Sequence, residues 1–105
     1  MLKRNDCINY AQNFVDRVIA KGIEIKYAML FGSYAKNTQD ENSDVDILLV
    51  GEKFSGVGFI DNRLIASELI EFDEVQVKTY STDDFMDSDP LIEEIKRTAL
   101  NLRIN

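Results

Sequence analysis

The 105-residue sequence contains no histidine, no tryptophan, one proline and one cysteine. Without histidine the chain cannot form a Ser-His-Asp hydrolase, a Cys-His protease or a histidine-ligated zinc site. The lone cysteine, Cys7, cannot form an internal disulfide and has no second cysteine at a metal-binding spacing. These absences leave other side chains, chiefly carboxylates, as the candidates for chemistry.

Long apolar runs are also missing. No segment approaches the length of a membrane span, and the first residues lead into polar sequence rather than into an apolar signal core. We therefore expect a cytoplasmic protein without a membrane partner. The length predicts a single domain, residues 1–105, that is large enough for one modest core.

Positive charge is scarce, with 12 Lys and Arg against 19 Asp and Glu and a net charge of −7. This balance argues against nucleic acid as a partner, because sequence-independent binding depends on Lys and Arg neutralising phosphates. Acids concentrate in the last third of the chain, at Asp73, Glu74, Asp83, Asp84, Asp87, Asp89, Glu93 and Glu94. The simpler interpretation is a solvated acidic surface, and the alternative is a docking face for a basic partner protein.

Hydrophobic periodicity predicts helices and strands in an interleaved order. The spacing of apolar residues predicts a first helix that is capped by Asn5 or Asp6 and ends at Gly22. Strands are expected over 25–31, 44–50 and 73–80. The Gly32-Ser33 turn is followed by one helical turn, and residues 37–43 read as an exposed loop. This order predicts an α/β or α+β fold with a small mixed β-sheet flanked by helices.

Three further helices are expected from apolar stripes in the second half of the chain. The first is marked by Ile60, Leu64, Ile65 and Leu69. A short helix should begin at Ser81-Thr82 and pack through Phe85 and Met86. Pro90 suits the first turn of the last helix, and its predicted buried stripe is Leu91, Ile92, Ile95 and Leu100.

The most informative motif is Gly32-Ser33, followed after ten residues by Asp44-Val45-Asp46. If Asp44 and Asp46 lie in a strand, their side chains point the same way with α-carbons roughly 6.5–7 Å apart. Two carboxylates at that separation repel each other unless a cation lies between them. Hard oxygen ligands of this kind suit Mg²⁺, which commonly shares its coordination shell with substrate phosphates. The motif therefore predicts metal-assisted chemistry on a nucleotide.

The segments LFGSYAK (30–36) and SDVDILLV (43–50) resemble the minimal nucleotidyltransferase family of the polymerase β-like nucleotidyltransferase superfamily. The signature of that superfamily is Gly-Ser, a spacer and then Asp-x-Asp before an apolar strand. The resemblance extends more weakly over most of the chain, because the expected order of helices and strands matches the whole minimal domain.

The resemblance implies a role for each motif residue. Gly32 lets the backbone approach the triphosphate, and Ser33 bonds a phosphate oxygen with help from nearby backbone N–H groups. Asp44 and Asp46 are the implied catalytic residues and bind Mg²⁺ that bridges the nucleotide phosphates. In the implied two-metal scheme, a second ion activates an acceptor hydroxyl for attack on the α-phosphorus, and pyrophosphate leaves.

Three positions depart from the family pattern. Lys36 stands where many relatives carry arginine, so it supplies a phosphate-binding charge without a bidentate fork. Asn37 replaces a glycine, and asparagine tolerates left-handed backbone better than most residues. Alignment of the third strand puts Gln76 where active members carry a third acid. Glu74 lies two residues earlier on the same strand face and is the candidate third metal ligand, although a solvent-facing role is the simpler interpretation.

The resemblance implies an Mg²⁺-dependent nucleotidyltransferase that moves AMP from ATP to a protein or small-molecule acceptor. The sequence leaves no room for the separate acceptor domain of larger relatives, so the acceptor site is expected from a second copy of the chain, another subunit or the acceptor itself. Many minimal nucleotidyltransferases pair with a helical HEPN protein as antitoxin to toxin. The alternative, favoured by Gln76, is a catalytically weakened nucleotide-binding module that regulates or neutralises a partner protein.

Overall fold

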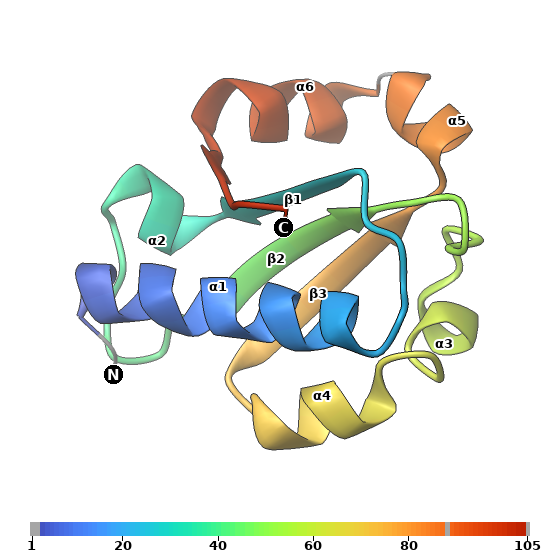
Figure 1. Ribbon diagram of the computed structural model, residues 1–105. Helices are drawn as coiled ribbons and strands as arrows, with labels where there is room; N and C mark the ends of the chain where they lie inside the picture. The colour runs from blue at the N-terminus through green and yellow to red at the C-terminus, as the bar shows by residue number, and fades with distance from the viewer. Residues whose placement is uncertain (1–2, 88, 105) are drawn as a thin grey trace.

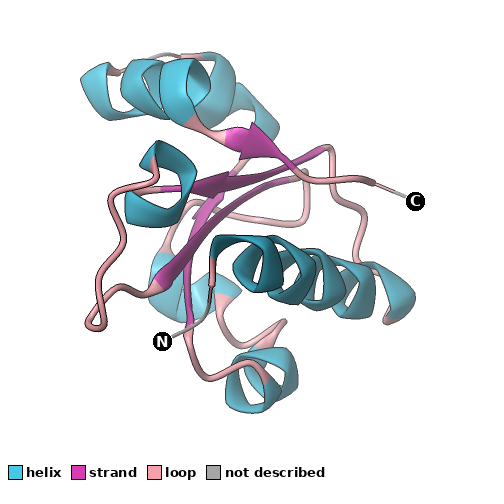
Figure 2. Ribbon diagram, turned by 90° about the vertical axis from the view of Figure 1, so that its left-hand side faces the viewer, coloured by secondary structure: helices cyan, strands magenta, loops and turns pink. Residues whose placement is uncertain are grey.

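The computed structural model describes residues 3–87 and 89–104, so the predicted domain of residues 1–105 also includes positions outside the described part. A four-stranded sheet of order β3-β2-β1-β4 lies between helices on both of its faces (Figures 1 and 2). The strands are β1 (Tyr27–Phe31), β2 (Val45–Val50), β3 (Val75–Tyr80) and β4 (Leu100–Asn101). The helices are α1 (Arg4–Ala20), α2 (Ser33–Lys36), α3 (Gly58–Asp61), α4 (Ala66–Glu71), α5 (Thr82–Met86) and α6 (Pro90–Thr98). The predicted mixed sheet flanked by helices is confirmed.

Strand β2 runs antiparallel to β1 and parallel to β3, and β4 pairs antiparallel with β1. In this register Asp46 lies opposite Phe31 on one side and Gln76 on the other. Because side chains alternate along a strand, the register fixes which residues of three strands share a face. It therefore decides which side chains lie beside Asp46.

Two apolar clusters, one on each face of the sheet, form the core. One cluster joins α1 to alternate residues of the strands and includes Phe14, Leu30, Ile47 and Leu49. The other joins α5 and α6 to the intervening strand residues and includes Met29, Leu48, Val50, Phe85, Ile92 and Ile95. Asp46 shares the strand parity of Leu48 and Val50, so it belongs to the face that α6 covers. The continuous apolar run of β2 is explained by this burial on both faces.

Most helix boundaries agree with the sequence signals, and α1 begins earlier than expected. Its N-cap is Lys3, so the predicted cap at Asn5 or Asp6 was wrong, and no side-chain cap bond replaces it. Gly22 ends the helix as predicted, with a positive φ of 96°. Ser81 caps α5 by accepting a hydrogen bond from the Asp84 N–H at 3.1 Å, and Pro90 lies in the first turn of α6.

The single helix predicted from Ile60 to Leu69 is wrong, because α3 and α4 are two short helices. Ile60 and Leu64 are 46% and 42% exposed, whereas Ile65 is fully buried. Asp61 is the buried residue of α3. Its carboxylate accepts hydrogen bonds from the neighbouring loop and from β3, and these bonds turn Asp61 rather than Ile60 towards the core.

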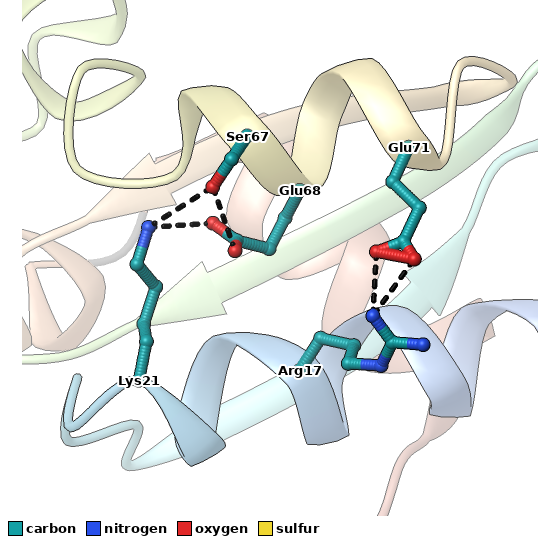
Figure 3. Close-up of polar contacts among 5 residues, drawn as sticks. All are labelled: Arg17, Lys21, Ser67, Glu68 and Glu71. Carbon is teal, nitrogen blue, oxygen red and sulfur yellow. Dashed lines mark hydrogen bonds and ion pairs between the residues drawn. The ribbon is translucent and has the colours of Figure 1, made fainter.

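Helix α4 is attached to α1 by polar contacts that Figure 3 shows. Arg17 contacts both carboxylate oxygens of Glu71 at 2.6 and 2.7 Å, and Lys21 contacts Glu68 at 2.7 Å. Burial favours the protonated form of Glu68, but its bonds with Lys21 and Ser67 outweigh that effect and lower its pKa. Exposed pairs such as Arg17 with Glu71 contribute little stability. Ile65 and Phe72, which flank α4, belong to the apolar cluster of α1, and Leu69 packs against it.

Smaller corrections concern the apolar stripes and the strand ends. Phe85, Ile92 and Ile95 are buried as predicted, whereas Leu91 and Met86 are 41% and 64% exposed and Leu100 lies in β4 rather than in the last helix. Strands β1 and β3 each begin two residues later than expected. In the described ranges, none of the helices combines the length and the apolar character needed to cross a bilayer.

Candidate active site

The turn between β1 and α2 has a backbone that only glycine adopts readily. Gly32 has φ 76° and ψ −152°, a region that is essentially restricted to glycine. Ser33 follows as the first residue of α2, and its hydroxyl group forms no hydrogen bond with the described residues. The predicted Gly-Ser turn is therefore present, and a serine hydroxyl is available beside it.

Gly32 and Asp46 are in direct contact across the β1–β2 pair. A Cβ atom at Gly32 would overlap Oδ2 of Asp46 and would lie 3.1 Å from its Cγ. Asp46 is opposite Phe31, the residue that precedes the turn. The register of this antiparallel pair thus places one carboxylate of the motif against the backbone of the Gly-Ser turn.

Asp44 and Asp46 line one cavity of about 440 Å³, together with Phe31, Gln76, Val77 and Lys78. Asp44 lies just before β2, and Asp46 is its second residue. The observed strand therefore begins one residue later than predicted, but both carboxylates still line the same cavity. The two candidate catalytic residues are brought together at the end of the sheet where β1 ends and where β2 and β3 begin.

Asp46 is half-buried, whereas Asp44 is exposed. Burial raises the pKa of Asp46, and the nearby negative charge of Asp44 raises it further. Both causes disfavour two ionised carboxylates in the absence of a counter-ion. A cation between the two groups would relieve the repulsion, so the electrostatics of this pair fit a metal site.

Gln76 and not Glu74 accompanies the two acids. Gln76 pairs with Asp46 in the parallel register and lines the same cavity. Glu74 precedes β3 and is not part of the cavity lining, and its backbone carbonyl accepts a hydrogen bond from the Val45 N–H at 2.9 Å. Within the described ranges, no three His, Cys, Asp or Glu side chains form a group that could hold a metal. The expectation that Glu74 completes such a group is not supported by this geometry.

The donor set nevertheless suits Mg²⁺. Two carboxylates and an amide carbonyl oxygen at one cavity supply the hard oxygen ligands that this ion prefers. Magnesium sites in nucleotide enzymes commonly use one or two carboxylates and complete their shell with phosphate oxygens and water. Asp44 and Asp46 are thus the residues that could hold the ion, and Gln76 could add a neutral ligand.

Lys36, the last residue of α2, forms an ion pair with an acid of α6. Its Nζ atom is 3.0 Å from Oε1 of Glu94 on α6, and this contact lowers the pKa of Glu94. Both residues line a second, mostly apolar cavity of about 210 Å³ between α2 and α6, which also touches Phe31 and Gly32. The positive charge expected for phosphate binding is therefore partly compensated by an acid from another helix.

Two residues hold α2 in place. The Arg4 guanidinium donates hydrogen bonds from Nε to the Tyr34 carbonyl at 2.9 Å and from Nη2 to the Ala35 carbonyl at 3.4 Å. Asn37 ends α2 in the left-handed conformation, with φ 60° and ψ 37°. The tolerance of asparagine for that conformation, expected at the position where relatives carry glycine, is confirmed.

Comparison with known families identifies the arrangement. The family model described as "Polymerase beta, Nucleotidyltransferase" matches residues 12–100. The chain belongs to this nucleotidyltransferase family. The resemblance expected from the Gly-Ser turn and the Asp-x-Asp segment is confirmed.

One curated relative of this chain is a protein of Methanocaldococcus jannaschii that is named as a candidate protein adenylyltransferase. The two are 43% identical over 60 residues, which make up 55% of this chain and 62% of the relative. The match thus spans less than two thirds of the length of that relative.

Two solved structures share the nucleotidyltransferase fold. A nucleotidyltransferase candidate from Sulfolobus solfataricus superposes with a TM-score of 0.69 at 15% identity, over 93% of this chain and 80% of that one. A structure of a toxin–antitoxin with AMP-PNP superposes with a TM-score of 0.63 at 18% identity, over 90% of this chain and 73% of that one. At these identities the likeness establishes the fold.

Three residues at the candidate site could not be assigned a role from the sequence. Lys78 could have been found, because it lies two residues after Gln76 and so on the same strand face. Phe31 precedes the turn and lines both cavities, but its apolar character suggested only a strand end. The sequence around Glu94 does not predict its contact with Lys36, because that contact depends on how α6 packs.

Proposed function

We propose that this chain is an Mg²⁺-dependent nucleotidyltransferase that moves AMP from ATP onto an acceptor hydroxyl. The observation that carries the proposal is the contact between Gly32 and Asp46, which sets the Gly-Ser turn directly beside the cavity that both acids of the motif line. Family membership and the relative named as a candidate protein adenylyltransferase support the reaction type and the nucleotide.

Each residue then has a defined task. Asp44 and Asp46 would hold a magnesium ion, and such an ion would supply positive charge against the phosphate oxygens. Gly32 admits the phosphate chain close to the backbone, and the free hydroxyl of Ser33 donates a hydrogen bond to a phosphate oxygen. The acceptor oxygen forms a bond to the α-phosphorus, the bond from that phosphorus to the bridging oxygen breaks, pyrophosphate leaves, and the hydroxyl proton of the acceptor passes to solvent. Such transfers depend on positioning and charge neutralisation.

A second candidate function is favoured by Gln76. At the position opposite Asp46, glutamine is uncharged and is a poor base. This composition fits a nucleotide-binding module that neutralises or regulates a partner protein. The fold shared with a toxin–antitoxin structure containing AMP-PNP supports an antitoxin role, with a helical HEPN-type toxin as the partner.

Transfer of label from ATP into proteins of a host lysate tests the first function. We expect α-labelled ATP with Mg²⁺ to label an acceptor, and γ-labelled ATP to leave it unlabelled, because the α-phosphate is transferred and pyrophosphate is released. The double variant Asp44→Ala/Asp46→Ala should give no band. Glu52→Gln is the matched control, since Glu52 is an exposed acid in the loop beyond the opposite end of β2.

The outcomes separate the two functions. A band that depends on Asp44 and Asp46 supports a transferase and allows the acceptor to be identified. If wild type binds Mg²⁺-ATP but labels neither proteins nor added small-molecule acceptors, the transferase proposal fails and the binding-module function is favoured. If wild type does not bind Mg²⁺-ATP at all, both functions are overturned.

A further inference from the structure

Lys78 is an exposed lysine on β3 that lines the cavity of the two acids. Lys78 pairs with Leu48 in the parallel register, two residues further along each strand than the pair formed by Asp46 and Gln76. Gln76 and Lys78 therefore lie on the face of the sheet to which Asp46 belongs. A long, flexible side chain at this position can bring its ammonium group over the cavity.

The ammonium group of Lys78 is unpaired in the described part of the chain, where it forms no hydrogen bond or ion pair. Lys36, the lysine of the Gly-Ser motif, instead contacts Glu94 at 3.0 Å. Lys96 on α6 lies 4.7 Å from the centre of the Phe85 ring. Of these three lysines, Lys78 can bind a new anion without giving up an existing contact.

The charges at the cavity show why a cation is needed there. Asp44 and Asp46 together carry two negative charges, which one divalent ion would neutralise, and Gln76 adds none. The triphosphate group would then remain largely uncompensated. A second divalent ion lacks the third carboxylate that would hold it, whereas an ammonium group binds phosphate oxygens as a compact point charge.

We propose that Lys78 binds the phosphate chain of the nucleotide at the cavity of Asp44, Asp46 and Gln76. This inference rests on the nucleotide binding proposed above and goes beyond it, because the phosphate-binding cation of the motif itself is Lys36. Lys78 supplies positive charge from the β3 side of the cavity, opposite the Gly-Ser turn.

Titration calorimetry with Mg²⁺-ATP and with Mg²⁺-tripolyphosphate tests the role without relying on turnover. We expect Lys78→Met to weaken both ligands by about tenfold or more, since charge-assisted hydrogen bonds are among the strongest polar contacts. Lys78→Arg restores the charge and should recover most of the affinity. Lys53→Met is the matched control, because Lys53 is an exposed lysine in the loop after β2.

Thermal unfolding verifies that each variant is folded, and Lys78→Gln provides a second neutral substitution that keeps a polar side chain. Affinity within twofold of wild type in both neutral variants overturns the inference while the proposed function stands. An equal loss in Lys53→Met also overturns it, because net charge alone would then explain the effect. A wild-type protein that binds neither ligand overturns the proposed function and this inference together.

Discussion

The carboxylate of Asp46 packs against the backbone of Gly32, with no space between them for a side chain at position 32. These residues belong to different halves of the motif and are brought together by the antiparallel pairing of β1 with β2. The spacing between the Gly-Ser turn and the acids thus has a structural meaning. It allows an exposed loop over 37–43 to return the chain so that an acid lies beside the turn.

We expect Gly32→Ala to damage both stability and nucleotide binding. The φ of 76° and ψ of −152° would cost an alanine about 1–3 kcal/mol of backbone strain, and the new Cβ would displace the Asp46 carboxylate. Chemical denaturation should show the loss of stability. Calorimetry with Mg²⁺-ATP should show binding weakened at least tenfold, a loss expected when a carboxylate ligand is displaced.

Substitutions at two other glycines separate the effect of backbone strain from the effect of displacing the Asp46 carboxylate. Gly22→Ala imposes backbone strain at φ 96° but meets no atom within 4 Å, and Gly58→Ala meets none and has no positive φ. Binding should therefore survive both substitutions, and stability should fall only in Gly22→Ala. Normal nucleotide affinity in a folded Gly32→Ala protein would contradict the proposed importance of the contact.

The sequence sufficed for the parts of the site that depend on local geometry. A turn could be expected at Gly32-Ser33, and Asn37 could be expected to tolerate the left-handed backbone because of its residue type. Asp44 and Asp46 could be expected on one side of a strand from alternation alone. The mixed sheet could also be predicted, because the apolar periodicity indicated the order of helices and strands.

Contacts between distant elements could not be predicted. Alternation placed Glu74 and Gln76 on one face of the expected strand, whereas β3 begins at Val75 and pairs Gln76 with Asp46. The prediction of one helix from Ile60 to Leu69 was wrong, because the buried carboxylate of Asp61 reorients the first turn of this segment. An acid in an amphipathic segment is normally assigned to solvent, so its hydrogen-bond partners from other elements were not visible in the sequence.

We expect Gln76→Asp to increase nucleotidyl transfer if the position opposite Asp46 faces the metal and acceptor. The substitution adds a third carboxylate to the cavity of Asp44 and Asp46, which strengthens metal binding and provides a base. The rise should be roughly a hundredfold in initial rate, the lower end of the range for general-base catalysis. Initial rates with α-labelled ATP at several Mg²⁺ concentrations measure it.

Glu74→Gln serves as the counterpart of that substitution, because Glu74 lies outside the cavity lining. It should leave the transfer rate unchanged. A flat rate in Gln76→Asp, combined with lost activity in Glu74→Gln, would show that Glu74 is the third ligand after all.

Removing the acid that pairs with Lys36 should strengthen nucleotide binding. Glu94→Gln breaks the 3.0 Å ion pair and leaves the Lys36 ammonium beside the Gly-Ser turn without its main competitor. Because both side chains are exposed and screened, we expect an increase of only a few-fold in Mg²⁺-ATP affinity. Glu93→Gln makes the same change in net charge one residue earlier on α6. An equal increase in that variant would mean that Lys36 is not involved.

Asp61 is a buried acid whose charge stabilises the fold. It is 1% exposed and accepts hydrogen bonds from the Ser55 and Gly56 N–H groups and from the Ser55 and Thr79 hydroxyls, the last at 2.6 Å. Burial alone would raise its pKa, but these bonds outweigh burial and lower it. Asp61→Ala leaves the donors unpaired and should cost about 2–4 kcal/mol of unfolding free energy, measured by chemical denaturation at pH 7.

The lowered pKa of Asp61 also predicts how its contribution changes with pH. A carboxyl group whose folded-state pKa lies below its unfolded value of about 3.9 contributes its full stability above that value. The contribution is lost as pH falls through the folded pKa. The stability difference between wild type and Asp61→Asn should therefore be constant from about pH 5 to pH 7 and shrink below about pH 4, as the sign of the linkage requires. Glu52→Gln, which changes an exposed acid, should show no such trend. A difference for Asp61→Asn that stays constant down to about pH 2 would mean that the ionised form of Asp61 is not what stabilises the loop from Ser55 to Asp61.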